Sequence, residues 1–313
     1  MTDRALIVRE EGLLTTVQDL GRLGWGALGI PAAGALDPEA LRVANLLVGN
    51  PEGAAGLEIT LLGPTLRARG EIDLAVAGGE FGPAPGRVLR LRDGEAVPLG
   101  AREGGRGSAR AVVAVSGGFA VPALLGSRST CVSARFGGLH GGPLRKGDVV
   151  PVGDPAAAPH PEAQAPEFPA GGDVILRVLP GPQAHFFDDE ATGLFYSSAF
   201  RLRPESNRIG FRLEGPTIAG DLAATEELPS EGTALGSVQI PAGGQPIVLL
   251  NERPTTGGYP KIATVIAVDL GLLVRAQPGA TVRFVPAAAG EARRLLVERE
   301  ERIRRWAEEL KRR

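Results

Sequence analysis

The amino-acid sequence predicts a mainly β protein whose short strands form barrels or sandwiches. Glycine and proline are frequent, with 45 Gly and 26 Pro among 313 residues, so turns are expected at short intervals along the chain. Between the turns lie short runs rich in Val, Leu and Thr, which favour strands. Short strands at this spacing favour a barrel or a sandwich over a parallel sheet of alternating strands and helices.

The strands are expected in both halves of the chain. The first half opens with two runs around an acidic turn, Ala5 to Val8 and Leu13 to Val17. Further runs in this half are each bounded by Gly or Pro: Leu57 to Leu62, Ile72 to Ala77, Arg87 to Leu91, Ala111 to Val115 and Asp148 to Val152. The second half has similar runs at Val174 to Leu179, Phe211 to Leu213, Ser237 to Ile240, Ile247 to Leu250, Ala263 to Val268 and Thr281 to Val285.

Two helices are expected as well. Asp37 suits an N-cap, Pro38 suits the first helical position, and Gly49 marks the stop after an apolar stripe that begins at Leu41. A second, amphipathic helix is expected near the end of the chain, where apolar residues form one stripe: Ala292, Leu296, Ile303, Trp306 and Leu310.

These elements predict a division into two β-barrel-like domains, residues 1–150 and 173–286, followed by the helix in residues 287–313. Residues 151–172 contain six prolines and no periodic pattern, so they are expected to form a semi-rigid connector. The two halves also share a short sequence pattern, because LEITLLGPTL at Leu57 to Leu66 is similar to RLEGPTI at Arg212 to Ile218. A shared pattern of this kind would fit two related domains.

Charge and composition exclude several classes of partner. The 34 basic and 36 acidic residues are mixed along the chain and leave a net charge of −2, which predicts no nucleic-acid and no membrane partner. A single cysteine excludes an internal disulfide, and the first residues lack the apolar core of a signal peptide. We therefore expect a cytoplasmic protein.

Common nucleotide and metal motifs are absent from the sequence. Gly24, Gly26 and Gly29 spell GxGxxG, but this run leads into Ile30 and Pro31 and not into a helix, so it does not predict a dinucleotide site. The sequence contains no phosphate-binding GxxxxGK[ST] loop, no GxSxG elbow and no HExxH. The three histidines lie far apart, so no metal site is expected.

A first polar stretch precedes the helix that starts at Pro38. Gln18, Asp19 and Arg22 lie within one turn of each other, beside glycines that allow the backbone to approach a ligand closely. The structural alternative is a glycine-rich surface loop tied by an ion pair between Asp19 and Arg22.

A second polar stretch, Asn251 to Leu270, combines hydroxyls, a glycine pair and a cation that suit an oxyanion or a carboxylate. Its candidate site residues are Arg253, Thr255, Thr256, Gly257, Gly258, Tyr259 and Lys261. Lys261 stands out because the chain otherwise prefers arginine. The structural alternative is a hairpin turn at the glycine pair, with Tyr259 packed outside.

Motifs from Ile7 to Phe284 resemble one known family. They include TTVQDLGR, ANLLVGN, LEITLLGPTL, VLPGPQ, RIGFRLEGP, SEG, GSVQIPAGGQPIVL and TTGGYPKIATVIAVDL. In this order they are similar to the biotin-dependent carboxyltransferase-like family, which includes the C subunit of 5-oxoprolinase, allophanate hydrolase subunit 2 and the Kip antagonist. The resemblance implies cyclophilin-like β-barrel domains. Two positions depart from the pattern, Asn207 and Glu252, where the family usually has Asp.

The resemblance also implies an activity, which is an ATP-dependent 5-oxoprolinase that opens 5-oxoproline to glutamate. It implies two partners, a Kip inhibitor-like B component and a lactam-hydrolase-type A component, and ATP with Mg in the complex. On this hypothesis Lys261, Arg22 and Asp19 are catalytic. The substrate is bound by Gln18, Arg253 and residues 255–259. Replacing Lys261 or Arg22 by Ala is expected to abolish activity and to leave thermal stability nearly unchanged.

Two alternatives stay open at this stage. In the first alternative the chain is the carboxyltransferase component of a urea carboxylase. The carboxybiotin would then be on a separate chain, because a biotinyl lysine is normally flanked by methionine and the only Met here is Met1. In the second alternative the chain is a regulatory protein without enzyme activity that binds a Kip inhibitor-like partner.

Overall fold

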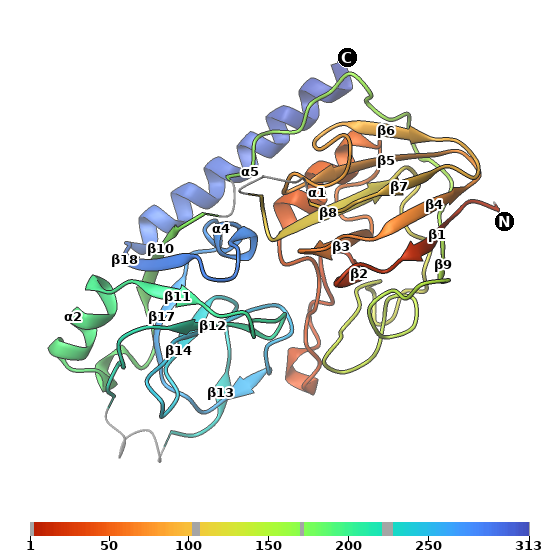
Figure 1. The fold of residues 1–313 in the computed structure, drawn as a ribbon. Helices are drawn as coiled ribbons and strands as arrows, with labels where there is room; N and C mark the ends of the chain where they lie inside the picture. Colours follow the sequence, from red (N-terminus) through yellow and green to blue (C-terminus); the bar gives the residue numbers. More distant parts are fainter. Residues whose placement is uncertain (1–2, 102–106, 170–171, 221–227, 313) are drawn as a thin grey trace. The chain divides into compact units, whose positions relative to one another are not determined.

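The fold comes from a computed structural model that describes residues 3–101, 107–169, 172–220 and 228–312 (Figure 1). The chain divides into two compact units. Unit 1 contains Met1–Leu23, Ala33–Ala170 and Arg302–Arg313, and unit 2 contains Gly24–Ala32 and Gly171–Glu301. The domain boundaries expected at residues 150 and 173 stay a prediction.

Unit 1 is built on two antiparallel sheets. The first has the order β7-β4-β1-β9, with β7 at Ala96–Pro98, β4 at Thr65–Arg69, β1 at Ala5–Glu10 and β9 at Val149–Pro151. The second has the order β2-β3-β8-β5-β6, with β2 at Leu14–Gln18, β3 at Gly56–Thr60, β8 at Arg110–Val115, β5 at Ile72–Ala77 and β6 at Val88–Leu91.

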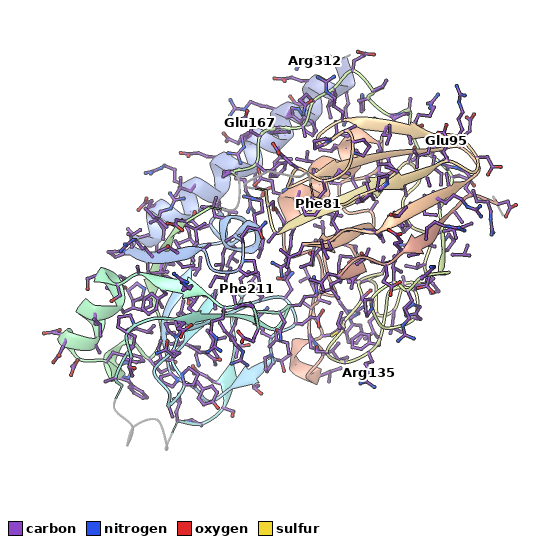
Figure 2. All side chains as sticks on the ribbon, viewed as in Figure 1. Phe81, Glu95, Arg135, Glu167, Phe211 and Arg312 are labelled. Atoms are coloured by element: carbon purple, nitrogen blue, oxygen red, sulfur yellow. The ribbon has the colours of Figure 1, made fainter. Side chains whose placement is uncertain are left out.

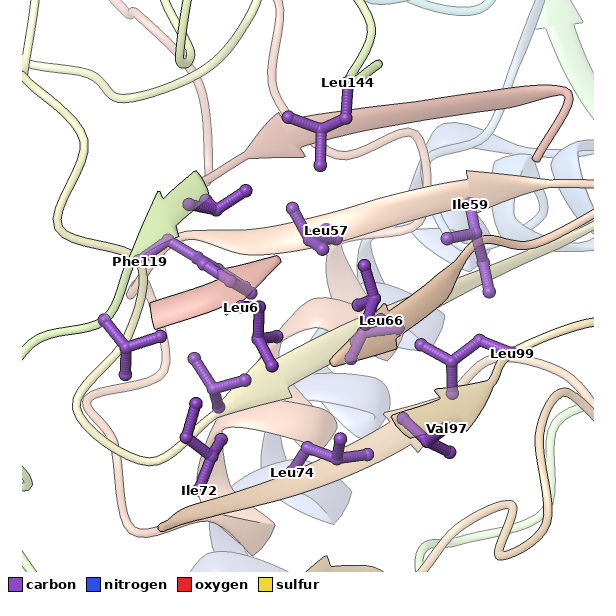
Figure 3. Packing of buried hydrophobic residues seen from close by; sticks show 14 of the residues in the cluster. Leu6, Leu57, Ile59, Leu66, Ile72, Leu74, Val97, Leu99, Phe119 and Leu144 are labelled. Atoms are coloured by element: carbon purple, nitrogen blue, oxygen red, sulfur yellow. The ribbon is translucent and has the colours of Figure 1, made fainter. Parts of the chain in front are cut away.

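The core of unit 1 lies between these strands, where Leu6, Leu57, Leu66 and Leu74 pack together (Figure 3). Both faces of β5 are buried. Leu74 faces this core, whereas Ala75 belongs to a second cluster with helix α1 (Pro38–Leu47). Side chains alternate between the faces of a strand, so small alanines on one face let the helix pack closely while larger residues fill the core.

Helix α1 has the ends that the sequence predicted. The Asp37 side chain accepts a hydrogen bond from the Ala40 N–H at 3.1 Å, and Pro38 occupies the first helical position. Gly49 has a φ of 75° and lies against the Ala158 carbonyl, so a side chain there would collide with the backbone.

The proline-rich stretch after β9 packs on unit 1. The His160 N–H donates to the Leu47 carbonyl and the Ala165 N–H donates to the Gly86 carbonyl, both at 2.8 Å. Ala163 and Ala165 are buried in the same cluster as α1. The stretch therefore forms some of its backbone hydrogen bonds with the rest of unit 1 and does not span solvent along its whole length.

Unit 2 contains a closed barrel of seven strands, in the order β10-β17-β14-β15-β12-β11-β18. The bounds are β10 at Val174–Pro180, β17 at Lys261–Val265, β14 at Ser237–Gln239, β15 at Ile247–Leu249, β12 at Gly210–Glu214, β11 at Phe200–Leu202 and β18 at Thr281–Pro286. A parallel pairing of β10 with β18 closes the barrel, and all its other pairings are antiparallel. The buried Phe211 lies among these strands (Figure 2).

Several small elements also belong to unit 2. They are η1 at Gly26–Leu28, η2 at Ala184–Phe186, α2 at Asp189–Ser197, a two-stranded sheet of β13 (Glu231–Gly232) and β16 (Thr256–Gly257), and α4 at Leu270–Arg275. The final helix α5 spans Ala289–Arg312, as the amphipathic stripe predicted. Within the described ranges no helix is both long enough and apolar enough to cross a membrane.

The mainly β class, with a barrel and a C-terminal helix, is therefore confirmed. In unit 1 the described strands are divided between two sheets and form no closed barrel. Strands β4, β7, β11, β13 and β16 and helices α2 and α4 have no counterpart among the predicted elements. Helix α2 is held by Asp188, which caps the Ala191 N–H, and by the buried Phe195, which stacks on Phe284. Only Ala191 and Phe195 of this short helix are buried, which is too short an apolar stripe to predict it from the sequence.

Candidate functional site

Asp19 is the centre of a hydrogen-bonded frame in unit 1. Its carboxylate accepts hydrogen bonds from the hydroxyls of Ser127 and Ser129, and from the N–H groups of Gly21 and Arg128, at distances between 2.5 and 2.8 Å. These donors satisfy the carboxylate within the protein. Asp19 therefore joins the loop after β2 to residues 127–129.

Arg22 reinforces the same frame from inside the protein. Its Nε donates to the Leu124 carbonyl at 3.0 Å, and Nη2 donates to the Ser129 carbonyl at 2.8 Å. The guanidinium also lies 4.7 Å from the ring centroid of Phe136. Burial lowers the pKa of Arg22, against the opposing effect of the nearby Asp19 charge.

Gln18 completes the set of polar residues predicted in this stretch. Its amide donates to the Thr130 carbonyl at 3.0 Å and accepts from the Gly34 N–H at 3.1 Å. Gln18, Asp19 and Arg22 are thus brought together, but each contacts the 127–130 segment or the Gly34 backbone. Among the described contacts, Asp19 and Arg22 form no direct ion pair. The two side chains are connected through the backbone and hydroxyl groups of residues 127–129.

Lys261 is the centre of a second polar cluster, in unit 2. Its ammonium lies 2.9 Å from Glu231 Oε1 and donates to the Tyr259 carbonyl at 3.4 Å. The Lys261 side chain is only 2% exposed, whereas that of Glu231 is 42% exposed. A buried cation needs an anionic partner, and here the partner is a carboxylate at the surface.

Gln183 holds both members of this pair. Its amide donates to Glu231 Oε1 at 2.6 Å and accepts from the Lys261 N–H at 3.2 Å. Gly181, two residues earlier, lies so close to the Lys261 carbonyl that a Cβ there would overlap it. The hydrogen bond from Lys261, followed by that from Gln183, lowers the pKa of Glu231, so this carboxylate is charged at neutral pH.

Gln239 is the fourth member of the cluster. It pairs with Lys261 across β14 and β17, and its Nε2 lies 3.0 Å from the position that a Cβ on Gly257 would occupy. Gly257 in turn pairs with Glu231 across β16 and β13. Residues directly opposite in an antiparallel pair share a face, so these pairings gather the side chains. We call Gln183, Glu231, Gln239 and Lys261 the Lys261 cluster.

The other predicted residues of this stretch lie in the loop before β17. Arg253 Nε donates to the Thr233 carbonyl at 3.1 Å, and burial lowers the pKa of its guanidinium. The Thr255 carbonyl accepts from the Thr233 N–H at 3.0 Å, while Thr256 and Gly257 form β16. Gly258 and Tyr259 line a mainly apolar cavity of about 300 Å³ together with Phe187, Ile218, Ile240 and Pro260.

The two unusual positions of the sequence also lie in unit 2. Glu252 Oε1 is 2.6 Å from Arg208 Nε, and both side chains are almost completely buried. The longer acidic side chain therefore still supplies a partner for this arginine. Asn207 Oδ1 accepts from the Ile209 N–H at 2.9 Å, a role that needs an oxygen acceptor but no charge.

Sequence reasoning did not assign Gln183, Glu231 and Gln239 to the site. Each lies in a motif that carried the family resemblance, VLPGPQ, SEG or GSVQIP, but the three motifs are far apart in the chain. The barrel pairing of β14 with β17 brings Gln239 to Lys261, whereas Glu231 and Gln183 reach the cluster from outside the barrel strands. Within the described ranges no group of three or more His, Cys, Asp or Glu side chains could hold a metal ion.

Comparison with known proteins gives a consistent result. Residues 28–286 match the family described as "Carboxyltransferase domain, subdomain A and B". The chain is 40% identical over 288 residues to the C subunit of 5-oxoprolinase from Escherichia coli, and the match covers 90% of this chain and 91% of that protein. It is 33% identical over 312 residues to the protein of the same name in Haemophilus influenzae, covering 94% and 96%.

Solved relatives are longer chains. The structure of the Kluyveromyces lactis urea amidolyase matches with a TM-score of 0.87 and 29% identity, over 96% of this chain but 20% of that one. The structure of TTHA0988 matches with a TM-score of 0.79 and 38% identity, over 90% of this chain and 55% of that one. The protein thus spans about half of one solved relative and a fifth of the other.

Proposed function

The chain belongs to the carboxyltransferase domain family, subdomains A and B, and from that membership we propose that it acts as the C subunit of an ATP-dependent 5-oxoprolinase. The complex would open the lactam ring of 5-oxoproline to give glutamate. The proposal is supported by the two 5-oxoprolinase relatives, which align with this chain over nearly their whole length. The observation that carries it is the Lys261 cluster, which offers a cation and amide groups suited to a small anionic amide.

The chemistry of the reaction explains the need for such a cluster. A lactam carbonyl is a weak electrophile, and its oxygen gains negative charge as water adds to the carbon. A buried ammonium placed beside that oxygen stabilises the charge without first reorganising solvent. Glu231 orients the Lys261 ammonium, while Gln183 fixes the carboxylate. In this proposal Lys261 is the catalytic cation and Glu231 is its positioning residue.

ATP is treated as a second substrate of the complex. The sequence contains no GxxxxGK[ST] motif, and its described residues offer no cluster of acidic or imidazole ligands for Mg²⁺. Mg²⁺ commonly keeps several waters and is held by substrate phosphates, so it would arrive with the nucleotide. We assign no nucleotide site to this chain and derive no step through it.

The proposed partners are a Kip inhibitor-like B component and a lactam-hydrolase-type A component. The two relatives are each named as the C subunit of an enzyme, and such a name implies other subunits. A need for partners is also consistent with TTHA0988, of whose chain this protein spans only 55%.

The second candidate function is the carboxyltransferase step of a urea carboxylase. It is favoured by the TM-score of 0.87 with the urea amidolyase of Kluyveromyces lactis. Urea and 5-oxoproline both present an amide carbonyl beside an N–H group, so the same cluster would suit either one. Identity is lower, at 29%, and the carboxyl donor would have to come from another chain.

Reconstitution from the three purified components tests the proposal. Glutamate and ADP are measured with 5-oxoproline while each component is omitted in turn. We expect no glutamate without this chain, no dependence on biotin or bicarbonate, and ATP consumption only with 5-oxoproline. Full turnover without this chain would contradict the proposal and favour a regulatory role. A requirement for urea and bicarbonate would favour the carboxyltransferase function.

A further inference from the structure

The two glutamines of the Lys261 cluster are in different states. Gln183 is occupied at both ends of its amide, by Glu231 and by the Lys261 N–H. Gln239 is only 6% exposed, yet within the part of the chain that the structure describes its side-chain amide has no hydrogen-bond partner. The amide is not fully enclosed by the protein, so it can bind water or a ligand.

The surroundings of Gln239 keep this amide open. Gly257 has no side chain, and a Cβ at that position would lie 3.0 Å from Gln239 Nε2. Across the ladder from Gln239 is Lys261, whose ammonium is paired with Glu231. The free amide therefore lies beside a fixed positive charge, in a setting that supplies one hydrogen-bond donor and one acceptor in addition to the cation.

We propose that Gln239 recognises the amide edge of the substrate and so determines the selectivity for a lactam. A lactam is a cis amide, and its N–H and C=O groups point to the same side of the ring. A glutamine carboxamide offers a donor and an acceptor with the matching spacing, as it does to the paired groups of an adenine edge. The Gln239 oxygen accepts from the lactam N–H, and its NH₂ donates to the lactam carbonyl. This inference rests on the proposed function.

This pairing has a consequence for selectivity. A site built to hydrogen-bond an N–H rejects the analogue that lacks it, because the bound analogue would cover the glutamine oxygen and leave it unpaired. The informative analogue is the lactone of the same ring, 5-oxotetrahydrofuran-2-carboxylate, which keeps the carbonyl and the carboxylate and replaces the N–H by oxygen. The complex should therefore prefer 5-oxoproline to this lactone.

The test compares the reconstituted wild-type complex with one that contains Gln239→Met. The KM for 5-oxoproline is measured together with the inhibition constant of the lactone. We expect the wild type to favour the lactam by about tenfold or more, and the variant to lose most of that preference, with a loss in kcat/KM for 5-oxoproline of about 10- to 100-fold. Thermal stability should not fall, because the amide has no partner among the described residues to lose.

Two further variants make the test decisive. Gly257→Ala would place a methyl group against the Gln239 amide and should reduce the same preference by an independent route. Gln164→Met, at an exposed glutamine of unit 1, is the matched control and should change neither quantity. A Gln239→Met complex that turns over 5-oxoproline and keeps the wild-type lactam preference overturns this inference alone. A wild-type complex that does not turn over 5-oxoproline overturns the proposed function as well.

Discussion

The ammonium of Lys261 lies 2.9 Å from the carboxylate of Glu231, in an ion pair whose cation is buried and whose anion is half exposed. The two residues come from β17 and β13, which are not neighbours in any sheet of the described chain. Gln183 links them by bonding to the Glu231 carboxylate and to the Lys261 backbone. A positive charge is thus held below the surface by a carboxylate that is itself half exposed.

Lys261→Met is expected to reduce the activity of the complex by at least about 100-fold, because one electrostatic contact to a developing oxyanion is worth about 10²–10³ in kcat. The fold should survive, since the half-exposed Glu231 can be hydrated when its partner is removed. The measurement is kcat for glutamate release, with thermal melting of the isolated chain. Lys146→Met, at an exposed lysine in unit 1, is the matched control. Wild-type turnover in Lys261→Met would exclude Lys261 as the catalytic cation.

Glu231→Gln should lower the free energy of unfolding at neutral pH but not in acid. The hydrogen bonds from Lys261 and Gln183 lower the pKa of Glu231 in the folded chain. The folded chain therefore binds fewer protons, and the stabilisation is complete above the unfolded pKa of about 4.3 and is lost as the pH falls through the folded pKa. Denaturant unfolding of both proteins across this range measures the difference. If the difference in unfolding free energy between wild type and Glu231→Gln persisted unchanged into strong acid, this account would be contradicted. The control is Glu167→Gln, at an exposed carboxylate.

Arg22→Ala is expected to destabilise the protein by about 2–4 kcal/mol, because several buried carbonyls lose their donor and a large side chain is removed. Arg22 is only 1% exposed and bonds to the carbonyls of Leu124 and Ser129. This result differs from the expectation for a site residue, whose loss would leave stability nearly unchanged. Chemical denaturation compares it with Arg145→Ala, at an exposed arginine of the same unit. Equal stability of the two variants would restore Arg22 as a candidate for a direct role in the reaction.

Glu252→Ala should destabilise unit 2 by about 3–5 kcal/mol, because it leaves the buried Arg208 charge without its carboxylate. Replacing both residues by methionine should cost less than the sum of the two single changes, since neither charge is then left alone. A double-mutant cycle measured by urea unfolding checks this coupling. Additive effects would mean that the ion pair does not act as a unit. Glu252→Asp is the informative conservative variant, because it restores the acidic residue more usual in the family.

Local sequence signals were enough for much of the secondary structure. Asp37, Pro38 and Gly49 define the ends of α1 by capping chemistry that acts within a few residues. The stripe that includes Ile303 and Leu310 predicted α5, because an amphipathic face repeats with the helical period. Runs such as Ile72–Ala77 predicted strands correctly, although nothing local showed that both of their faces are buried.

The site depended on contacts between distant parts of the chain. The sequence alone determined that the protein is mainly β, since composition and spacing are local properties. It also singled out Gln18, Asp19, Arg22 and Lys261 as candidate site residues, which stays a prediction. Only the tertiary structure decided that Arg22 is committed to backbone carbonyls, that Lys261 pairs with Glu231, and that Gln239 keeps its amide free of the described residues. The reason is physical: strand pairing fixes which side chains share a face, and burial decides which polar groups already have a partner.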